Sequence, residues 1–416
     1  MKIKANKVIQ LITIFIILVE YDYFKLIGLG GLTRSSIIFP LIFGIGILCR
    51  FERLFTRKIK GNLHQADRIV ITIIICSFGI SLYTLIVYDS NPIDIYSVIV
   101  RLFTIVFIYS LMFSFESEKK EEYILHNILT LGIIMYMIKF LIWYLFNFHG
   151  IVIAPQIIFE YGEKWTRNNI FRLDDSSLMY LFLFSCLFYY RKNKKIRYLV
   201  YAGIQLFYSI IVTASRSSTV SLAIIIIIDY IISSPHALTK LRKYLILFIG
   251  GLVILGTTTF QNFINSFKLS GYSSSLSSVT RLNALSYYID TLNNMENPLK
   301  YIFGLGALST NVVREKAILR GPLGIYFIED LGILGIIFQY GLIGLYIVLT
   351  IYVTQYKCTK KKLHITKDYI SYQNSIILIM CTLIPSLLVQ CIFDKSRIVA
   401  LPFFISLVLY YSKIKY

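Results

Sequence analysis

Four charged residues stand out because of their types and their positions in an otherwise apolar chain. Arg216 lies in a polar turn, residues 213–219, between two apolar runs. Arg281 lies in the long hydrophilic segment that follows, and Glu329 and Asp330 stand where that segment meets the next apolar run. An arginine guanidinium presents a planar fork of donors that matches phosphate oxygens, and a positioned carboxylate can take a proton from a hydroxyl group. The four residues therefore predict a site that stabilises an anionic group beside a general base.

The composition predicts that a membrane scaffold positions these residues. The chain has 416 residues, of which 56% are apolar and 15% are charged, and its mean hydropathy is +0.69. A soluble protein carries roughly a quarter charged residues. Repeated apolar runs of about 18 to 25 residues are long enough to cross a hydrocarbon core of ~30 Å as helices. We therefore expect an all-α integral membrane protein, because the alternating segments of ~10 residues that mark a transmembrane barrel do not appear.

The apolar runs predict about twelve transmembrane helices in a single polytopic domain that spans residues 1–416. The long hydrophilic loop, 261–324, falls between the ninth and the tenth helix. The expected spans are 8–28, 36–50, 69–88, 94–114, 123–147, 176–190, 198–214, 217–232, 243–260, 326–355, 369–391 and 397–412.

Alternating charge predicts the orientation of these spans. More than half of the 42 Lys and Arg residues fall in every second connection, for example in 50–68, 191–197 and 357–367. Cytoplasmic connections carry such an excess of cations. Both termini are then cytoplasmic, and the connection 149–175 and the loop 261–324 lie on the outer side.

The outer loop contains one expected helix. Leu282, Leu285, Tyr288, Ile289, Leu292 and Met295 recur at the spacing of an amphipathic helix. Ser278 or Thr280 is the expected N-cap, and the pair Asn297-Pro298 is the expected stop. The helix would either lie flat at the membrane interface or pack on neighbouring spans, and the sequence leaves both open.

Charges inside the spans gather toward the outer leaflet. Arg101 and Lys139 lie within the fourth and fifth expected spans, ~10–12 Å below the outer surface at 1.5 Å per residue. Intramembrane charges are costly and are functional candidates by default. They would line a cationic pocket for an anionic lipid headgroup or a diphosphate, or would form structural ion pairs with Glu20 or Asp22 of the first span. Both alternatives stay open.

Three stretches of the chain carry a family resemblance. The first is the Ser-Arg-Ser turn at 215–217. The second is Thr-Arg-Leu at 280–282, followed by Asn-Pro-Leu at 297–299 and Phe-Gly-Leu-Gly at 303–306. The third begins at Glu329 and has glycines at 332 and 335, although two residues, not one, separate the glutamate from the first glycine. In this order, over about 120 residues, they resemble the O-antigen polymerase and ligase superfamily of bacterial surface-polysaccharide assembly.

The resemblance implies a glycosyltransferase on the outer face of the bacterial cytoplasmic membrane. It would join oligosaccharide repeat units linked to undecaprenyl diphosphate, for an O-antigen or a capsule. Its partners would be that substrate, membrane lipid, a chain-length regulator and a flippase. Catalysis would need Arg216 and Arg281 to stabilise the departing diphosphate. Glu329 or Asp330 would serve as the base, or would instead cap or pair at a helix end.

Further cations are expected to contact phosphate or sugar. The sequence offers no clear metal site, because none of the six cysteines has metal-ligand spacing, and no cofactor is expected. Asp174-Asp175 is interpreted as the N-cap of the following helix. The net charge of +20 is explained by loop cations, so no nucleic-acid partner is expected. The substrate-binding candidates are Arg101, Lys139, Arg172, Arg314 and Arg320.

Three rival functions remain. Ligases of the superfamily carry a histidine about ten residues before the third stretch, but 261–324 contains none, which favours a polymerase. A flippase or secondary transporter, which is not an enzyme, would also explain the spans and buried cations, although no repeat relates the two halves. A glycosyltransferase that uses a polyprenyl-monophosphate sugar typically places an acidic pair in the first outer loop, and 29–35 has none.

Overall fold

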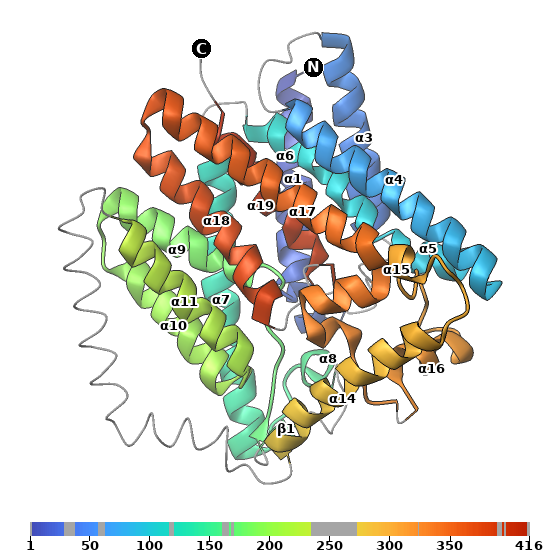
Figure 1. Ribbon diagram of the computed structural model, residues 1–416. Helices are drawn as coiled ribbons and strands as arrows, with labels where there is room; N and C mark the ends of the chain where they lie inside the picture. The colour runs from blue at the N-terminus through green and yellow to red at the C-terminus, as the bar shows by residue number, and fades with distance from the viewer. Residues whose placement is uncertain are drawn as a thin grey trace.

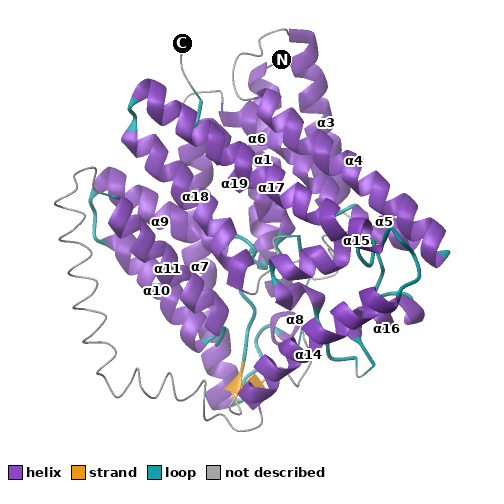
Figure 2. Ribbon diagram, in the orientation of Figure 1, coloured by secondary structure: helices purple, strands orange, loops and turns teal. Residues whose placement is uncertain are grey.

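The protein is helical over nearly all of the residues that the computed structural model describes. These residues are 2–28, 38–56, 63–115, 120–159, 166–167, 170–233, 273–322, 324–388, 393–394 and 397–413. The rest are connections and one small antiparallel hairpin, β1 (Thr166–Arg167) and β2 (Ile170–Phe171). The expected all-α class is confirmed for this part of the chain (Figure 2). The ninth expected span, 243–260, lies outside the described residues.

The N-terminal half forms an antiparallel set of apolar helices. It comprises α1 (Lys2–Glu20), α2 (Tyr23–Leu26), α3 (Phe39–Thr56), α4 (Leu63–Tyr88), α5 (Pro92–Ile99), the 3-10 helix η2 (Leu102–Phe107), α6 (Ile108–Phe115), α7 (Lys120–His149) and α8 (Pro155–Ile158).

The C-terminal half adds two helical groups and the shorter elements that lie between α11 and α17 in the chain. It comprises α9 (Met179–Asn193), α10 (Arg197–Ile211), α11 (Arg216–Ile232), α14 (Ser273–Asn294), α15 (Lys300–Phe303), α16 (Val313–Arg320), η3 (Ile328–Leu331), α17 (Ile333–Thr366), α18 (Tyr369–Leu388), η4 (Ile398–Ala400) and α19 (Leu401–Tyr411).

Four helices among the described residues are long and apolar enough to cross a membrane. They are Leu63–Tyr88, Glu121–His149, Ile333–Thr366 and Tyr369–Leu388. A fifth crossing results if Pro92–Ile99 and Leu102–Phe115, which are bent by 42° at Arg101, form one span. The other expected spans on described residues fall on shorter helices; α9, for example, has 15 residues, or ~22 Å at 1.5 Å per residue. The structure thus supports a helical membrane protein, and the number twelve stays a prediction.

The helices are arranged so that several elements between α11 and α17 gather at one end. The start of α1 and the end of α19 lie toward the top of Figure 1, whereas α14, α16 and the β-hairpin lie toward the bottom. The α17–α18 pair stands between α4 and the group formed by α9, α10 and α11. Near the upper end, the Arg191 guanidinium pairs with Asp229 and donates to Asn374 Oδ1 at 2.6 Å, which joins α9, α11 and α18.

The outer-loop helix is longer than its sequence pattern predicted. α14 begins at Ser273, so neither Ser278 nor Thr280 is its N-cap, and it ends at Asn294, shortly before the expected stop. Tyr288 and Leu292 are buried, which supports the packing alternative. They belong to a second apolar core that is separate from the main bundle core and consists of Ala284, Tyr288, Leu292, Leu305, Leu308, Leu319, Ile328 and Phe338. Leu282 of the same helix remains 64% exposed.

Close backbone packing explains the glycines of the second and third stretches. α17 breaks at Gly341, where φ is 62° and ψ is −152°, and the segment 304–306 lies in this break. Leu305 N donates to Phe338 O at 2.9 Å. A Cβ atom at Gly304 would lie 2.5 Å from the same oxygen, and one at Gly335 would lie 2.0 Å from Ile328 O. Glycine at 304 therefore lets the segment 304–306 pack on α17, and glycine at 335 lets the acidic turn η3 pack on it.

Candidate functional site

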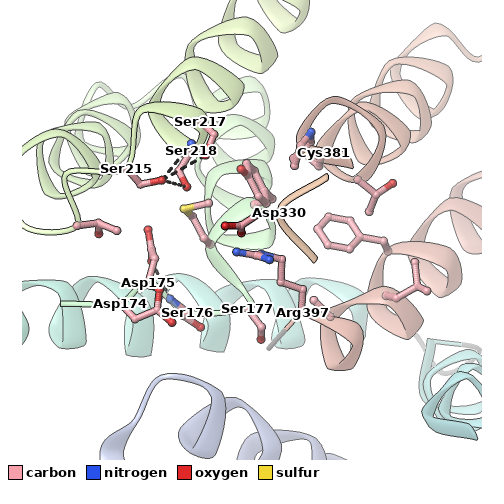
Figure 3. A pocket seen from close by; sticks show the side chains of 18 of the residues that line it. Asp174, Asp175, Ser176, Ser177, Ser215, Ser217, Ser218, Asp330, Cys381 and Arg397 are labelled. Atoms are coloured by element: carbon pink, nitrogen blue, oxygen red, sulfur yellow. Dashed lines mark hydrogen bonds between the residues drawn. The ribbon is translucent and has the colours of Figure 1, made fainter. Parts of the chain in front are cut away.

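A cavity of about 360 Å³ lies where six parts of the chain converge. Figure 3 shows the acidic 174–177 segment on one wall, the serines that begin α11 on another, and Asp330 with Arg397 near the centre. The described residues that line it are Arg172, Asp174, Asp175, Ser176, Ser177, Met179, Tyr180, Thr213, Ser215, Ser217, Ser218, Arg281, Asp330, Cys381, Thr382, Pro385, Arg397, Ala400, Leu401 and Phe404.

The turn before α11 presents its serines, not Arg216, to the cavity. Ser215 is the N-cap of α11, and its hydroxyl oxygen accepts from Ser218 N at 3.4 Å. The turn is tight because Ala214 has φ of 47° and Ser215 N donates to Ser209 O at 3.2 Å. Arg216, the first residue of the helix, is half-buried beside the cavity but is not among the described residues that line it. Its predicted catalytic role stays a prediction.

Arg281 and Asp330 meet in the cavity although they belong to different stretches of the sequence. The buried Nε of Arg281 has no hydrogen-bond partner among the described residues. Asp330 is exposed to the cavity, but the surrounding protein withdraws it from bulk water and so raises the pKa of its carboxyl group. Arg281 and then Arg397 oppose that rise. The carboxylate thus lies in the field of these two guanidinium groups and of Arg320, while Asp394 adds a like charge.

Arg397 is a lining residue that the sequence analysis missed. It lies between α18 and η4, directly before Ile398. In the structure its Nη1 lies 3.1 Å from Asp394 Oδ2. The next helical turn contributes Ala400, Leu401 and Phe404 to the same cavity wall, so the start of α19 positions Arg397.

Arg172 lines the same cavity, and its contact with substrate stays a prediction. Its Nε donates to the backbone oxygen of Thr213 at 2.8 Å. This bond joins the 172–178 connection to the turn before α11, because Leu173 N also donates to Val212 O at 3.2 Å. Two cavity walls from distant parts of the sequence are thereby held in register.

The expected N-cap role of Asp174-Asp175 is wrong. α9 begins only at Met179, with Leu178 at its N-cap position. Asp175 Oδ1 instead accepts from Tyr136 Oη at 3.0 Å and from Ser176 N at 2.8 Å. Burial raises the pKa of Asp175 to about 7, against the opposing effects of Lys139 and of these two hydrogen bonds. Asp-Asp-Ser-Ser resembles a capping sequence, but tertiary contacts hold the connection extended for several more residues.

The two acids of the third stretch have different surroundings. Glu329 is not among the described residues that line the cavity. Burial raises the pKa of its carboxyl group, Asp394 raises it further, and Arg320 and Arg101 lower it. Asp330 faces Arg281 and Arg397 instead. Of these two acids, only Asp330 is among the described residues that line the cavity, and a catalytic role for Glu329 stays a prediction.

Lys139 forms the structural ion pair that was one of its two expected alternatives. Its Nζ lies 2.6 Å from Asp22 Oδ2, and Lys25 Nζ lies 2.8 Å from the other oxygen of that carboxylate. Lys139 is only 4% exposed and also donates to the backbone oxygen of Asp174 at 3.4 Å. Lys139 therefore holds the connection at Asp174 against the end of α1. Substrate binding by Lys139 stays a prediction.

The other three predicted binding residues lie away from the cavity lining. Arg101 Nη2 donates to Tyr340 Oη at 3.1 Å, next to the break in α17. Arg320 stacks its guanidinium 3.7 Å from the centre of the Phe327 ring. Arg314 is exposed on α16. None of the three is among the described residues that line the cavity, and their contacts with substrate stay predictions.

Within the part of the chain that the structure describes, no group of three or more His, Cys, Asp or Glu side chains could hold a metal ion. A scan against protein-family models and a search of curated proteins both find no match to the chain. The case for a function therefore depends on the geometry of the cavity and on the three sequence stretches.

Proposed function

We propose that the protein polymerises oligosaccharide repeat units carried on undecaprenyl diphosphate, at the outer face of the bacterial cytoplasmic membrane. One observation supports this most strongly. Ser215 and Ser217 of the first stretch, Arg281 of the second and Asp330 of the third line a single cavity. These stretches carry the resemblance to polysaccharide polymerases and ligases, and nothing in their sequence separation requires them to meet.

The charges of the cavity suit the proposed reaction. A lipid diphosphate is already a good leaving group, so the enzyme chiefly needs preorganised donors where negative charge develops. Arg281 provides a buried Nε with no partner among the described residues, and Arg397 and Arg172 enter from other walls. Arginine is suited to this role because its planar fork can hold two phosphate oxygens at once.

Asp330 is proposed to orient the cations. Its carboxylate faces Arg281 and Arg397, so it favours conformations in which both guanidinium groups point into the cavity. The bound diphosphate would then replace Asp330 as the main counter-charge. This interpretation uses Asp330 as a positioning residue, and it leaves the removal of the acceptor proton to another group.

The arrangement of the fold is consistent with an outer-face site. The cavity is built partly by α14 and η3, which belong to the end opposite the first and last described helical ends (Figure 1). With the termini in the cytoplasm, as the distribution of cations predicts, the cavity opens toward the outer leaflet. There it would meet lipid-linked repeat units after they have been moved across the membrane.

Deletion of the gene tests the proposal. Surface glycan and extracted lipid-linked material would be separated on gels beside wild type. Single repeat units at the surface, without a ladder, would support the polymerase. Long polymer retained on the carrier lipid would indicate a ligase, and repeat units confined to the inner leaflet would indicate a flippase. Either of the last two results would contradict the proposal.

Complementation of the deletion strain links the function to the cavity. Arg281→Ala should not restore the ladder, whereas Lys316→Ala, which removes an exposed cation of α16, should restore it fully. Immunoblots of the membrane fraction would show that both variants are inserted in equal amounts.

A further inference from the structure

We infer that Asp175 is the general base that removes the proton from the acceptor hydroxyl, with its Oδ2 atom as the proton acceptor. The inference rests on the proposed function, because it assigns a role within that reaction. It departs from the sequence analysis, which placed the base at Glu329 or Asp330 and treated Asp175 as a helix cap.

The two oxygens of Asp175 have different environments. Oδ1 accepts two hydrogen bonds, from Tyr136 Oη at 3.0 Å and from Ser176 N at 2.8 Å. Oδ2 is buried and has no hydrogen-bond partner among the described residues. The side chain lines the cavity (Figure 3). A carboxylate that is oriented through one oxygen and unpartnered at the other is arranged to receive a proton from a ligand.

The other acids at the site are less suitable. Asp330 faces Arg281 and Arg397, the cations proposed to hold the diphosphate. It would therefore lie beside the leaving group and not beside the acceptor hydroxyl. Glu329 is not among the described residues that line the cavity. Asp174 uses its Oδ1 to accept from the backbone N of Asp175 at 2.9 Å. Asp175 alone of these acids combines access to the cavity, two orienting bonds and an unpartnered oxygen.

The step balances without a further reactant. The acceptor hydroxyl oxygen attacks the anomeric carbon of the donor sugar and forms the new glycosidic bond. The bond between that carbon and the diphosphate oxygen breaks, and the lipid diphosphate leaves with the electron pair. The hydroxyl proton passes to Asp175 Oδ2 and is later released to water or to the departing diphosphate.

Several charged and titratable groups surround the Asp175 carboxylate. Lys139 is the nearby cation, and it is already paired with Asp22. The other titratable groups that face Asp175 come from α1 and its end, α7, α9, α10 and the adjoining connection. They are Tyr21, Tyr136, Lys139, Asp174, Tyr180 and Tyr208. Lys139 is thus shared between two carboxylates, which leaves Asp175 basic enough to accept a proton, while Arg172, Arg281 and Arg397 line the same cavity.

Asp175→Asn tests the role with little change in structure. The amide oxygen can still accept from Tyr136 and Ser176, so the connection should keep its shape. In purified protein supplied with lipid-linked repeat units, kcat should fall by ~10²–10⁴-fold, the usual contribution of a general base. Binding of undecaprenyl diphosphate should remain within about twofold of wild type, because the arginines are intact. Asp175→Glu should recover part of the rate.

Tyr136→Phe adds a readout that a purely structural role would not change. It removes one hydrogen bond to Oδ1 that favours the ionised carboxylate. The acid limb of the kcat profile should therefore move to higher pH, while the rate on the plateau changes little. In Asp175→Asn that limb should disappear.

The outcomes separate this inference from the proposed function. Polymer formation by wild type and by Asp175→Asn at similar rates would overturn the assignment of the base and leave the polymerase intact. A parallel loss of diphosphate binding and rate in Asp175→Asn would also overturn it, because the residue would then act in binding. Failure of wild type to form polymer from lipid-linked units would overturn the proposed function and this inference together.

Discussion

Two cations, the buried Lys139 and the half-buried Arg281, illustrate different uses of charge in this protein. Lys139 lies 2.6 Å from Asp22, with its charge neutralised inside the helix bundle. Arg281 lines a cavity beside Asp330, and its buried Nε has no hydrogen-bond partner among the described residues. Both were candidates for binding an anion when only the sequence was considered. The structure supplies the partner of Lys139 but leaves donor capacity on Arg281.

The difference indicates which cation is available for a ligand. Taking a charge out of water is costly unless a partner and hydrogen bonds compensate for it. The first pair is compensated internally and joins α7 to the end of α1. The second pair is only loosely coupled, since no ion pair between Arg281 and Asp330 is found among the described residues. A bound diphosphate would give Arg281 a hydrogen-bond partner, whereas it would disrupt the ion pair of Lys139 with Asp22.

The largest effect on stability is expected from breaking the ion pair of Lys139 with Asp22. Lys139→Met leaves the buried Asp22 carboxylate with Lys25 as its remaining cation, so the loss of stability should be at most the ~3–5 kcal/mol of a broken buried pair. The measurement is the thermal unfolding midpoint and the folded yield in detergent. Adding Asp22→Asn should restore most of the stability, since asparagine tolerates the left-handed φ of 66° at this position. A stable double variant without polymer would show that Lys139 acts in catalysis after all.

Substitution of Arg281 should affect the rate and not the stability. Arg281→Ala should leave the unfolding midpoint nearly unchanged but reduce kcat by ~10²–10³-fold, the usual effect of losing one donor to a developing anion. Arg281→Lys should recover only part of the rate, because it lacks the bidentate fork. The rate is measured from polymer formed on lipid-linked repeat units. A large loss of stability without a selective loss of rate would mean that Arg281 has a structural role, as Lys139 has.

A smaller effect should follow from moving the acidic turn away from α17. In Gly335→Ala the new Cβ would lie 2.0 Å from Ile328 O, so η3 must shift. Overpacking of this kind costs about 1–3 kcal/mol, and displacement of Asp330 should lower the rate as well. Gly44→Ala is the matched control, because a Cβ there meets nothing within 4 Å. Equal rates in the two variants would indicate that the position of η3 is unimportant.

The smallest effect concerns the carboxylate beside Arg281. The pKa of Asp330 is raised in the folded state, so wild type loses stability as pH rises from the unfolded value, ~3.9, through the raised value. Asp330→Asn removes this cost. At pH 7 it should raise the free energy of unfolding by less than about 1 kcal/mol, because the side chain is exposed, and the unfolding midpoint should rise accordingly. The difference should vanish near pH 3. A lower midpoint for the variant at pH 7 would mean that the two arginines stabilise the carboxylate more than burial opposes it.

The sequence predicted the helical class and part of the site for clear physical reasons. Apolar runs locate helices even where the helices are short, as in α9, because burial in a bundle and insertion in a membrane favour the same residues. Arg281 and Asp330 could be nominated because charged residues at the ends of a long loop are unusual in so apolar a chain.

The remaining residues of the site depend on tertiary contacts that leave no local pattern. Arg397 resembles any cation of a short connection until α19 places it in the cavity. Asp175 precedes two serines and a helix, so local rules assign it to a cap. Only the contact with Tyr136, 39 positions away, reveals a different role. The pairing of Lys139 with Asp22 was foreseen as an alternative, but only the structure selects it.

Binding of undecaprenyl diphosphate to the purified protein in lipid nanodiscs tests the central claim most directly. Wild type should bind it. Arg281→Ala should weaken binding by about 10–100-fold, the equivalent of one charge-assisted hydrogen-bonding group. Lys316→Ala and the double variant of Lys139 and Asp22 should bind as wild type does. Undecaprenol, which lacks the diphosphate, should fail to compete. Equal binding by wild type and Arg281→Ala would contradict the account, because the cavity would then not be the diphosphate site.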